Sequence, residues 1–85
     1  MRWVHARPVK DSFVINLGDM MARWTNDEFA STVHRVMTGA NTSERFSIPF
    51  FFNPSFETVV ECLPHCSSPT KPAAYAPATA EEILR

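Results

Sequence analysis

The sequence predicts an all-β protein with a minor helical content. Two observations support this prediction: segments rich in β-branched or aromatic residues recur along the chain, and clusters of turn-forming residues separate them. The clearest pair of such segments is formed by residues 30–37 and residues 45–52. The stretch between them contains Gly39 and Asn41, which favour turns. We therefore predict a hairpin-like pair of strands around which the other elements are arranged.

The segments before this pair predict an edge strand, a buried strand and a short helix. Residues 2–9 suit an edge strand, because the proline within them cannot donate a backbone hydrogen bond to a central ladder. Residues 13–17 form a nearly continuous apolar run, which is typical of a strand buried on both faces. We expect the Asp19 carboxylate to cap a helical turn over residues 20–24, and residues 25–27 to form a turn.

The segments after the pair predict a further strand, a loop and a terminal helix. Residues 56–63 have the composition of a strand, and the proline-rich residues 64–78 are expected to form a surface connection without regular structure. Thr79 and Glu82 have the spacing of a capping box, in which each side chain satisfies a free group of the first helical turn. A short helix is therefore expected to begin at this point.

Length and composition limit the classes of function. A chain of 85 residues buries only roughly 60–65% of its unfolded surface, so one domain, or part of one, is the most it can form. The net charge of −1, with mixed signs, gives no reason to expect nucleic acid or a membrane as a partner. No signal peptide or long apolar span is visible, and Cys62 and Cys66 are compatible with a reducing compartment. We therefore expect a cytoplasmic protein.

Three side chains of the predicted strand pair form a candidate binding site. Side chains alternate between the two faces of a strand, so Arg45 and Ser47 point the same way, about 6.6 Å apart. A guanidinium matches a carboxylate with two planar donors, and the hydroxyl can donate a third hydrogen bond. His34 offers a nitrogen ligand that iron, zinc or copper accepts. On pattern alone, such residues are more often structural or solvated.

The combination of these residues points to a known family. The runs NLGDMMARWTNDEFASTVHRV and RFSIPFFFNPSFETVVECLP resemble the C-terminal part of the iron(II)/2-oxoglutarate-dependent dioxygenases, in the branch that includes isopenicillin N synthase. In that family, a His-x-Asp pair and a distal histidine hold iron(II), and an Arg-x-Ser pair on a following strand binds a carboxylate. The resemblance implies that His34 is a metal ligand and that Arg45 and Ser47 bind 2-oxoglutarate. It also implies a double-stranded β-helix, or jelly roll.

One departure from the family is plain in the sequence. None of the three histidines, His5, His34 and His65, is followed two residues later by an acidic residue, so the His-x-Asp pair is absent. We therefore interpret the chain as a C-terminal fragment, with an incomplete jelly roll and no turnover of its own. Residues 1–63 would form the later strands of the dioxygenase domain, and residues 64–85 a proline-rich loop and short helix.

The function implied by the resemblance is oxidoreductase chemistry. A dioxygenase of this family uses iron(II), 2-oxoglutarate and O2 to hydroxylate or oxidatively cyclise a small-molecule substrate. Two alternatives stay open. In enzymes like isopenicillin N synthase itself, the Arg-x-Ser pair binds the carboxylate of the substrate, and no 2-oxoglutarate is used. The chain could instead be a non-catalytic β-sheet remnant or binding module, which binds a carboxylate or a partner through an exposed strand edge.

Overall fold

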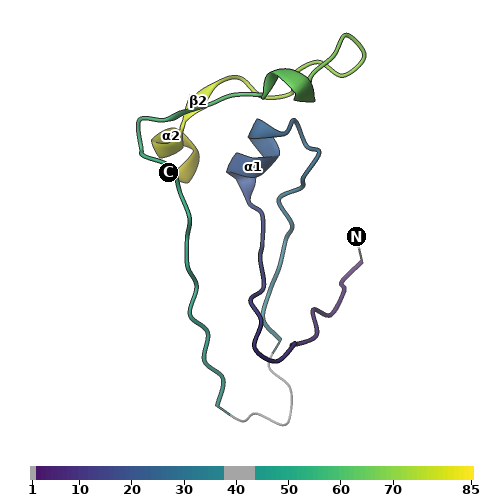
Figure 1. The fold of residues 1–85 in the computed structure, drawn as a ribbon, viewed down its shortest axis with the longest axis vertical. Coiled ribbons are helices and arrows are strands. Elements are labelled where there is room, and N and C mark those ends of the chain that lie inside the picture. Colours follow the sequence, from purple (N-terminus) through teal and green to yellow (C-terminus); the bar gives the residue numbers. More distant parts are fainter. Residues whose placement is uncertain (1, 38–43) are drawn as a thin grey trace.

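The computed structural model describes residues 2–37 and 44–85. A compact group of short elements lies at one end, and long extended segments run away from it (Figure 1). We call the compact part the head (residues 19–28 and 56–85). The extended parts are the first limb (residues 2–18), the second limb (residues 29–37) and the third limb (residues 44–55). The head contains α1 (Asp19–Trp24), β1 (Val59–Val60), the 3-10 helix η1 (Pro64–Cys66), β2 (Ala78–Thr79) and α2 (Ala80–Leu84).

A small apolar core holds the head together. Strands β1 and β2 pair in antiparallel fashion, with Val60 opposite Ala78. Val60 and Ala80 are fully buried, and Ala22 of α1 is 5% exposed, so the core lies where α1, β1 and α2 meet. Val59 is 54% exposed, because neighbouring side chains of a strand point to opposite faces. The predicted strand over residues 56–63 is therefore present, but it is reduced to its two central residues.

Helix α1 begins differently from the prediction but ends where the prediction placed its end, at Trp24. Asp19 is the first helical residue, Gly18 is the N-cap, and no side chain caps the helix, so the predicted cap is wrong. The carboxylate still lies in the first turn, where it interacts favourably with the helix dipole. The helix ends because Asn26 and Asp27 adopt left-handed backbone conformations, with φ of 52° and 66°. The predicted turn over residues 25–27 is confirmed.

The N-terminal cap of α2 is confirmed, although the Glu82 carboxylate accepts from the hydroxyl of Thr79 rather than from its backbone N–H, which a complete capping box would use. The hydroxyl oxygen of Thr79 accepts a 3.2 Å hydrogen bond from the backbone N–H of Glu82. The same hydroxyl donates to the Glu82 carboxylate at 3.0 Å. Backbone bonds also attach this helix to the strand region, because Ala80 N–H donates to Thr58 and Glu81 N–H donates to Phe56. The short helix is therefore fixed at its N-terminal end by both its cap and the segment beside it.

Apart from a turn at residues 10–11 of the first limb, where Asp11 has φ of 58°, the limbs run as extended segments, as the sequence predicts, but they are not paired (Figure 1). Within the described residues, the β1–β2 pair and one isolated bridge, between Ser68 and Lys71, are the β-pairings present. Residues 13–17 were expected to be buried, yet Phe13 is 95% and Ile15 is 85% exposed. An apolar strand is buried on both faces only when other layers cover it, and no described segment does so.

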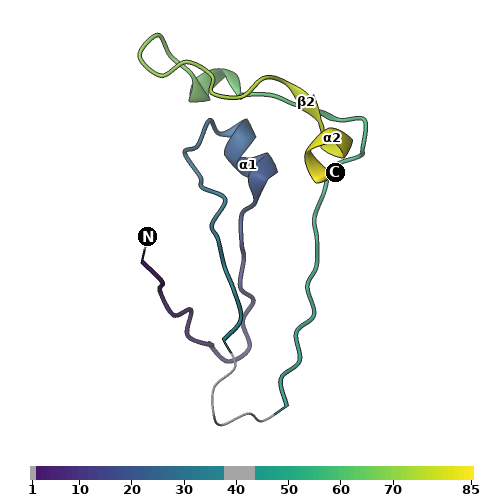
Figure 2. The ribbon, with the colours of Figure 1, turned by 180° about the vertical axis from the view of Figure 1, so that it is seen from behind.

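The exposed area shows how incomplete the packing is. The chain exposes 8111 Å², whereas a compact monomer of its mass would expose about 5,100 Å². Its radius of gyration is 16.5 Å, against about 12 Å for a compact domain of the same length. The limbs extend far from the head, as the two views in Figure 1 and Figure 2 show, which is consistent with this difference. The structure is therefore compatible with part of a β-rich domain.

In the part of the chain that is described, no helix has the length and apolar character needed to cross a membrane.

Candidate functional site

The predicted site residues lie on two different limbs. His34 is on the second limb, Arg45 and Ser47 are on the third limb, and all three are exposed. The two limbs are drawn as separate segments in Figure 1, and among the described residues no backbone hydrogen bond joins them. Arg45 and Ser47 therefore lie two residues apart on one segment, and no described hydrogen bond links that segment to the one that carries His34. Most of the predicted turn between the strands, residues 38–43, lies outside the described residues.

The imidazole of His34 has a defined orientation. Its Nδ1 atom lies 2.9 Å from the backbone carbonyl oxygen of Thr32. A carbonyl oxygen only accepts, so Nδ1 carries the proton, and Nε2 keeps its lone pair. Metal-binding histidines commonly use this arrangement, in which one ring nitrogen is held by a backbone carbonyl and the other faces the metal. In the neutral ring, this contact leaves Nε2 without a partner among the described residues.

The described residues do not form a complete metal site by themselves. Within the described ranges, no group of three or more His, Cys, Asp or Glu side chains is placed to hold a metal ion. The sequence contains no His-x-Asp or His-x-Glu. A transition metal needs several ligands in a preformed arrangement, so His34 fits one ligand position of the iron(II) that the family resemblance implies, and the described residues do not supply the others.

The first two limbs are held together by a contact next to the candidate ligand. The guanidinium carbon of Arg35 lies 4.1 Å from the centre of the Trp3 ring, within the range of a cation–π interaction. Residues 15–17 line a common surface hollow with residues 28–30 and Thr32, so the two limbs also run side by side near the head. The segment that carries His34 is therefore in contact with the first limb rather than with the third.

A dense set of contacts closes the base of the segment that carries the candidate site. We call residues 24–28 and 63–75 the clamp. Leu63 N–H donates to the Trp24 carbonyl at 2.8 Å, and Lys71 forms a 3.3 Å ion pair with Glu28. The region was predicted to be an irregular loop from residue 64 to 78, but it contains η1, the Ser68–Lys71 bridge and β2. The clamp helps to explain this regular structure, because Asn26 donates hydrogen bonds to the loop carbonyl oxygens of Cys66, Lys71 and Pro72.

Asn26 is the central residue of the clamp. Its Nδ2 donates to the carbonyl oxygens of Cys66 at 3.0 Å and Pro72 at 3.2 Å, with Lys71 at 3.5 Å. Its Oδ1 accepts from the backbone N–H of Ala74 at 2.9 Å. The residue is only 1% exposed, so these bonds replace the water that a buried amide would otherwise need. Sequence reasoning identified a turn here but not this role.

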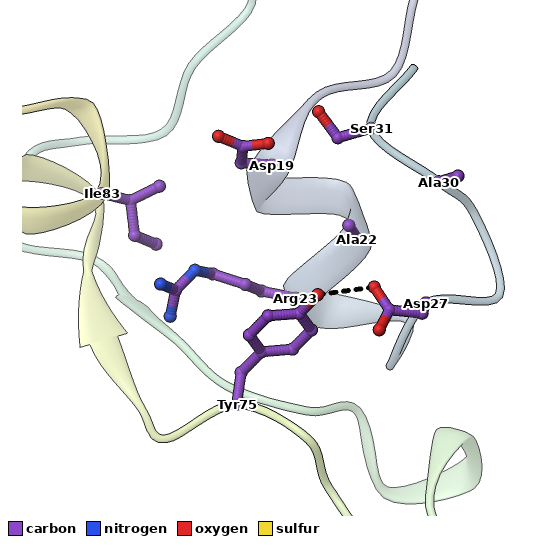
Figure 3. A pocket seen from close by; sticks show the side chains of 8 residues that line it. All are labelled: Asp19, Ala22, Arg23, Asp27, Ala30, Ser31, Tyr75 and Ile83. Atoms are coloured by element: carbon purple, nitrogen blue, oxygen red, sulfur yellow. Dashed lines mark hydrogen bonds between the residues drawn. The ribbon is translucent and has the colours of Figure 1, made fainter. Parts of the chain in front are cut away.

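A second polar contact joins the clamp to a cavity beside α1. The Tyr75 hydroxyl donates to the Asp27 carboxylate at 2.7 Å, and the Arg23 guanidinium lies 5.2 Å from the centre of the Tyr75 ring (Figure 3). The hydrogen bond to Asp27 raises the pKa of Tyr75 above its ordinary value of 10.0, because the bond requires the protonated phenol. The three side chains therefore form one small polar cluster.

The cavity itself is not the predicted carboxylate site. It has a volume of about 460 Å³ and lies between α1, α2 and the start of the second limb. The side chains that line it are Asp19, Ala22, Arg23, Asp27, Ala30, Ser31, Tyr75 and Ile83. None of the three candidate residues is among them. Two carboxylates and one guanidinium also give the cavity no excess of positive charge, which a carboxylate ligand would require.

Comparison with known proteins identifies the family. The sequence profile of the 2OG-Fe(II) oxygenase superfamily matches residues 1–54. The 2-oxoglutarate-Fe(II) type oxidoreductase hxnY of Emericella nidulans is 40% identical over 99% of this chain and 24% of its own length. Kihadalactone A synthase LFS of Citrus sinensis is 42% identical over 86% of this chain and 21% of its own length. Gibberellin 2-beta-dioxygenase 5 of Oryza sativa subsp. japonica is 44% identical over 69% of this chain.

These matches also define how much of the family domain is present. The chain spans about a quarter of the length of the first relatives. No solved structure matches it. Iron(II) and 2-oxoglutarate, which the resemblance implied, are the cofactor and cosubstrate that the names of the family and of the relatives give. Since the profile covers well over half of the sequence, the chain belongs to the 2OG-Fe(II) oxygenase superfamily.

Proposed function

We propose that this chain is part of an iron(II)- and 2-oxoglutarate-dependent dioxygenase. In this proposal, His34 supplies one metal ligand, and Arg45 and Ser47 bind the carboxylate of 2-oxoglutarate. The remaining ligands come from the part of the family domain that the chain does not include. The observation that carries the proposal is the family match over residues 1–54, which contains all three residues.

The local geometry of His34 supports its assignment. The 2.9 Å contact between Nδ1 and the Thr32 carbonyl fixes both the tautomer and the plane of the ring. Nε2 is then the atom that faces a metal. When bound, iron(II) would supply coordination positions for 2-oxoglutarate and O2. The contribution of the chain itself is to hold one ligand in a fixed orientation.

The third limb supports the assignment of the carboxylate site. Arg45 and Ser47 alternate with Phe46 and Ile48, which are 85% and 95% exposed. An extended segment with this alternation has one polar and one apolar face. Among the described residues, Arg45 has no carboxylate within ion-pair distance; the two pairs present are Lys71–Glu28 and Arg85–Glu81. Its guanidinium therefore keeps both planar donors for a ligand carboxylate.

We further propose that the limbs become strands of a jelly roll when the rest of the domain is present. Residues 1–63 would then belong to the later strands of the dioxygenase domain. Residues 64–85 would form the proline-rich loop and helix that pack on α1. The excess exposed area of about 3,000 Å² supports this. The exposure of large apolar side chains along the limbs also supports this proposal, because a completed sheet would cover them.

A non-catalytic role is the second candidate. The absence of a His-x-Asp pair, and the lack of any described hydrogen bond between the segments that carry His34 and Arg45, favour a remnant or binding module for the chain alone. Such a module would bind a carboxylate or a partner strand without turnover. The two candidates differ in what they predict once the missing part of the domain is supplied.

A chimera separates them. The matching quarter of the Emericella nidulans relative is replaced by this chain, and iron content and conversion of 2-oxoglutarate to succinate are measured. We expect the folded chimera to bind iron and to convert 2-oxoglutarate, and the isolated chain to give no succinate above a metal-only control. A folded, iron-loaded chimera without turnover would support the binding module. Dependence on a substrate carboxylate without 2-oxoglutarate would favour the branch of isopenicillin N synthase.

A further inference from the structure

We infer that Asn26 is a positioning residue for the proposed site. It acts through the clamp, which holds the two ends of the segment that carries the site residues. The segment between the two halves of the clamp, residues 29–62, carries His34, Arg45 and Ser47. By holding both ends of that segment together, the clamp contributes to the relation between the second and third limbs, together with the bonds from α2 to Phe56 and Thr58 at the root of the third limb. This inference rests on the proposed function for the roles of the three site residues, but not for the existence of the clamp.

Both ends of the site-bearing segment are fixed by direct contacts. At the start, Asn26, Asp27 and Glu28 each contact the loop over residues 66–75. At the end, the Leu63 N–H donates to the Trp24 carbonyl at 2.8 Å. Figure 1 shows the resulting arrangement, in which the second and third limbs both leave from the head and run in the same general direction. Closing so long a segment costs conformational entropy, which these bonds must offset.

Asn26 combines two properties that few residues share. Its backbone has φ of 52°, a left-handed conformation in which asparagine is far better tolerated than most residues. Its amide both donates to loop carbonyls and accepts from Ala74 N–H. Glycine would keep the backbone conformation but lose every side-chain bond. Aspartate would keep the shape but would set a carboxylate oxygen against carbonyl oxygens, where no donor remains.

The other clamp contacts are more replaceable. The ion pair between Lys71 and Glu28 joins side chains that are 47% and 66% exposed. Such exposed pairs contribute little to stability. Lys71→Ala is therefore the matched control inside the clamp. Thr79→Ala is the matched control outside it, because it removes the cap of α2 and leaves every clamp contact intact.

The first test measures the clamp in the full 85-residue chain. Amide hydrogen exchange is followed at Leu63, whose N–H bonds across the clamp without touching Asn26. We expect Asn26→Gly and Asn26→Asp to increase its exchange rate at least tenfold. Lys71→Ala and Thr79→Ala should change it less than threefold. Unchanged exchange at Leu63 in Asn26→Gly would overturn the inference, whatever the activity of any longer protein.

The second test measures positioning in the chimera with the Emericella nidulans relative. We expect Asn26→Gly to raise the apparent KM for 2-oxoglutarate at least fivefold, at a temperature where the folded fraction is unchanged. Thr79→Ala, which lowers the thermal midpoint without touching the clamp, should leave that KM unchanged. An equal KM for Asn26→Gly and the parent would overturn the inference. An inactive parent would instead overturn the proposed function, so the two failures are distinguishable.

Discussion

The hydroxyl of Tyr75 donates a 2.7 Å hydrogen bond to the carboxylate of Asp27, and this bond joins the loop before β2 to the turn after α1. The acceptor is charged, so the bond is of the stronger kind. It exists only while the phenol is protonated, which is why the pKa of Tyr75 is raised above 10.0. The nearby Arg23 opposes part of this effect, since a positive charge favours phenolate.

The first prediction follows from that pKa. A group with a raised pKa in the folded state stabilises the protein fully below its unfolded pKa, near 10, and loses the contribution as pH rises through the folded pKa. The contact of Tyr75 with Asp27 should therefore be intact at neutral pH and lost only in strongly alkaline solution. Tyr75 is the one tyrosine of the chain, so phenolate absorbance during a pH titration reports on it alone.

The matched variant for this titration is Asp27→Asn. The amide can still accept a hydrogen bond, but it lacks the charge that disfavours phenolate. The midpoint of the titration should therefore move down towards the ordinary value for tyrosine. An identical midpoint in Asp27→Asn and the parent chain would show that the Asp27 carboxylate does not hold the proton on Tyr75.

The second prediction concerns the core of the head and compares two adjacent valines. Val60 is fully buried, whereas Val59 is 54% exposed. Val60→Ala removes two buried methyl groups and leaves a cavity, so it should lower the free energy of unfolding by about 2 kcal/mol. Val59→Ala should lower it by less than about 0.5 kcal/mol. Thermal or denaturant unfolding of both variants measures the difference, and equal effects would mean that β1 does not pack as described.

The third prediction concerns self-association of the isolated chain. The excess exposed area, about 3,000 Å², is within the roughly 2,000–5,000 Å² that obligate interfaces bury. Phe46 and Phe50 are each 85% exposed on the apolar face of the third limb. Unpaired strands with exposed aromatic residues associate readily. We therefore expect oligomers or aggregates at micromolar concentration in sedimentation velocity.

A pair of variants tests which face is responsible. Replacing Phe46 and Phe50 by serine should reduce association, because it removes much of the apolar face. Replacing Arg45 by glutamine, on the other face of the limb, should leave association unchanged. A monodisperse parent chain would contradict the interpretation that the limbs pair with strands from the rest of the domain.

The local features of the fold were predictable because their signals lie close together in the sequence. Thr79 and Glu82 are three residues apart, and the pattern that predicts the capping box contains both partners. The turn at Asn26 and Asp27 is equally local. Asp19 shows the limit of such reasoning, because Gly18 became the N-cap and moved Asp19 one position into the helix. Helix boundaries are commonly uncertain by a residue or two.

The clamp could not be predicted, because its partners are distant in sequence. Asn26 contacts Cys66, Pro72 and Ala74, which lie 40, 46 and 48 residues later. No periodicity or spacing rule connects residues over such a distance. The strand prediction for the limbs failed in a different way. The residue pattern of each limb correctly predicted an extended backbone. Pairing and burial depend on neighbouring strands, about which the pattern of a single segment contains no information.

The candidate site was predictable only through the family resemblance. His34, Arg45 and Ser47 carry weak signals as isolated residues, and the structure leaves them on separate limbs. The family match over residues 1–54 gives the three residues their common context. Their roles stay a prediction, and the last experiment tests them one by one in the chimera.

The fourth prediction separates the roles of the three site residues. Arg45→Ala removes a bidentate, charge-assisted contact. The binding free energy of 2-oxoglutarate should therefore become less favourable by about 2–5 kcal/mol, while iron stays bound. Ser47→Ala removes one hydrogen bond to a charged group and should cost less, about 1.5–3 kcal/mol. Both effects are measured as 2-oxoglutarate binding to the folded, iron-loaded chimera. If Arg45→Ala instead weakened binding of the substrate alone, Arg45 would serve a substrate carboxylate.

His34→Ala should fail in a different way, because it removes a metal ligand rather than a contact to the cosubstrate. Iron content should fall together with activity, since loss of one ligand removes both affinity and geometry. The control is Thr32→Ala, which keeps the backbone carbonyl that orients the imidazole and should retain iron. The iron content of each purified variant shows whether His34 is a metal ligand. Full iron content and full turnover in His34→Ala would show that the imidazole on the second limb is not the ligand, and that the alignment of this limb with the family is displaced.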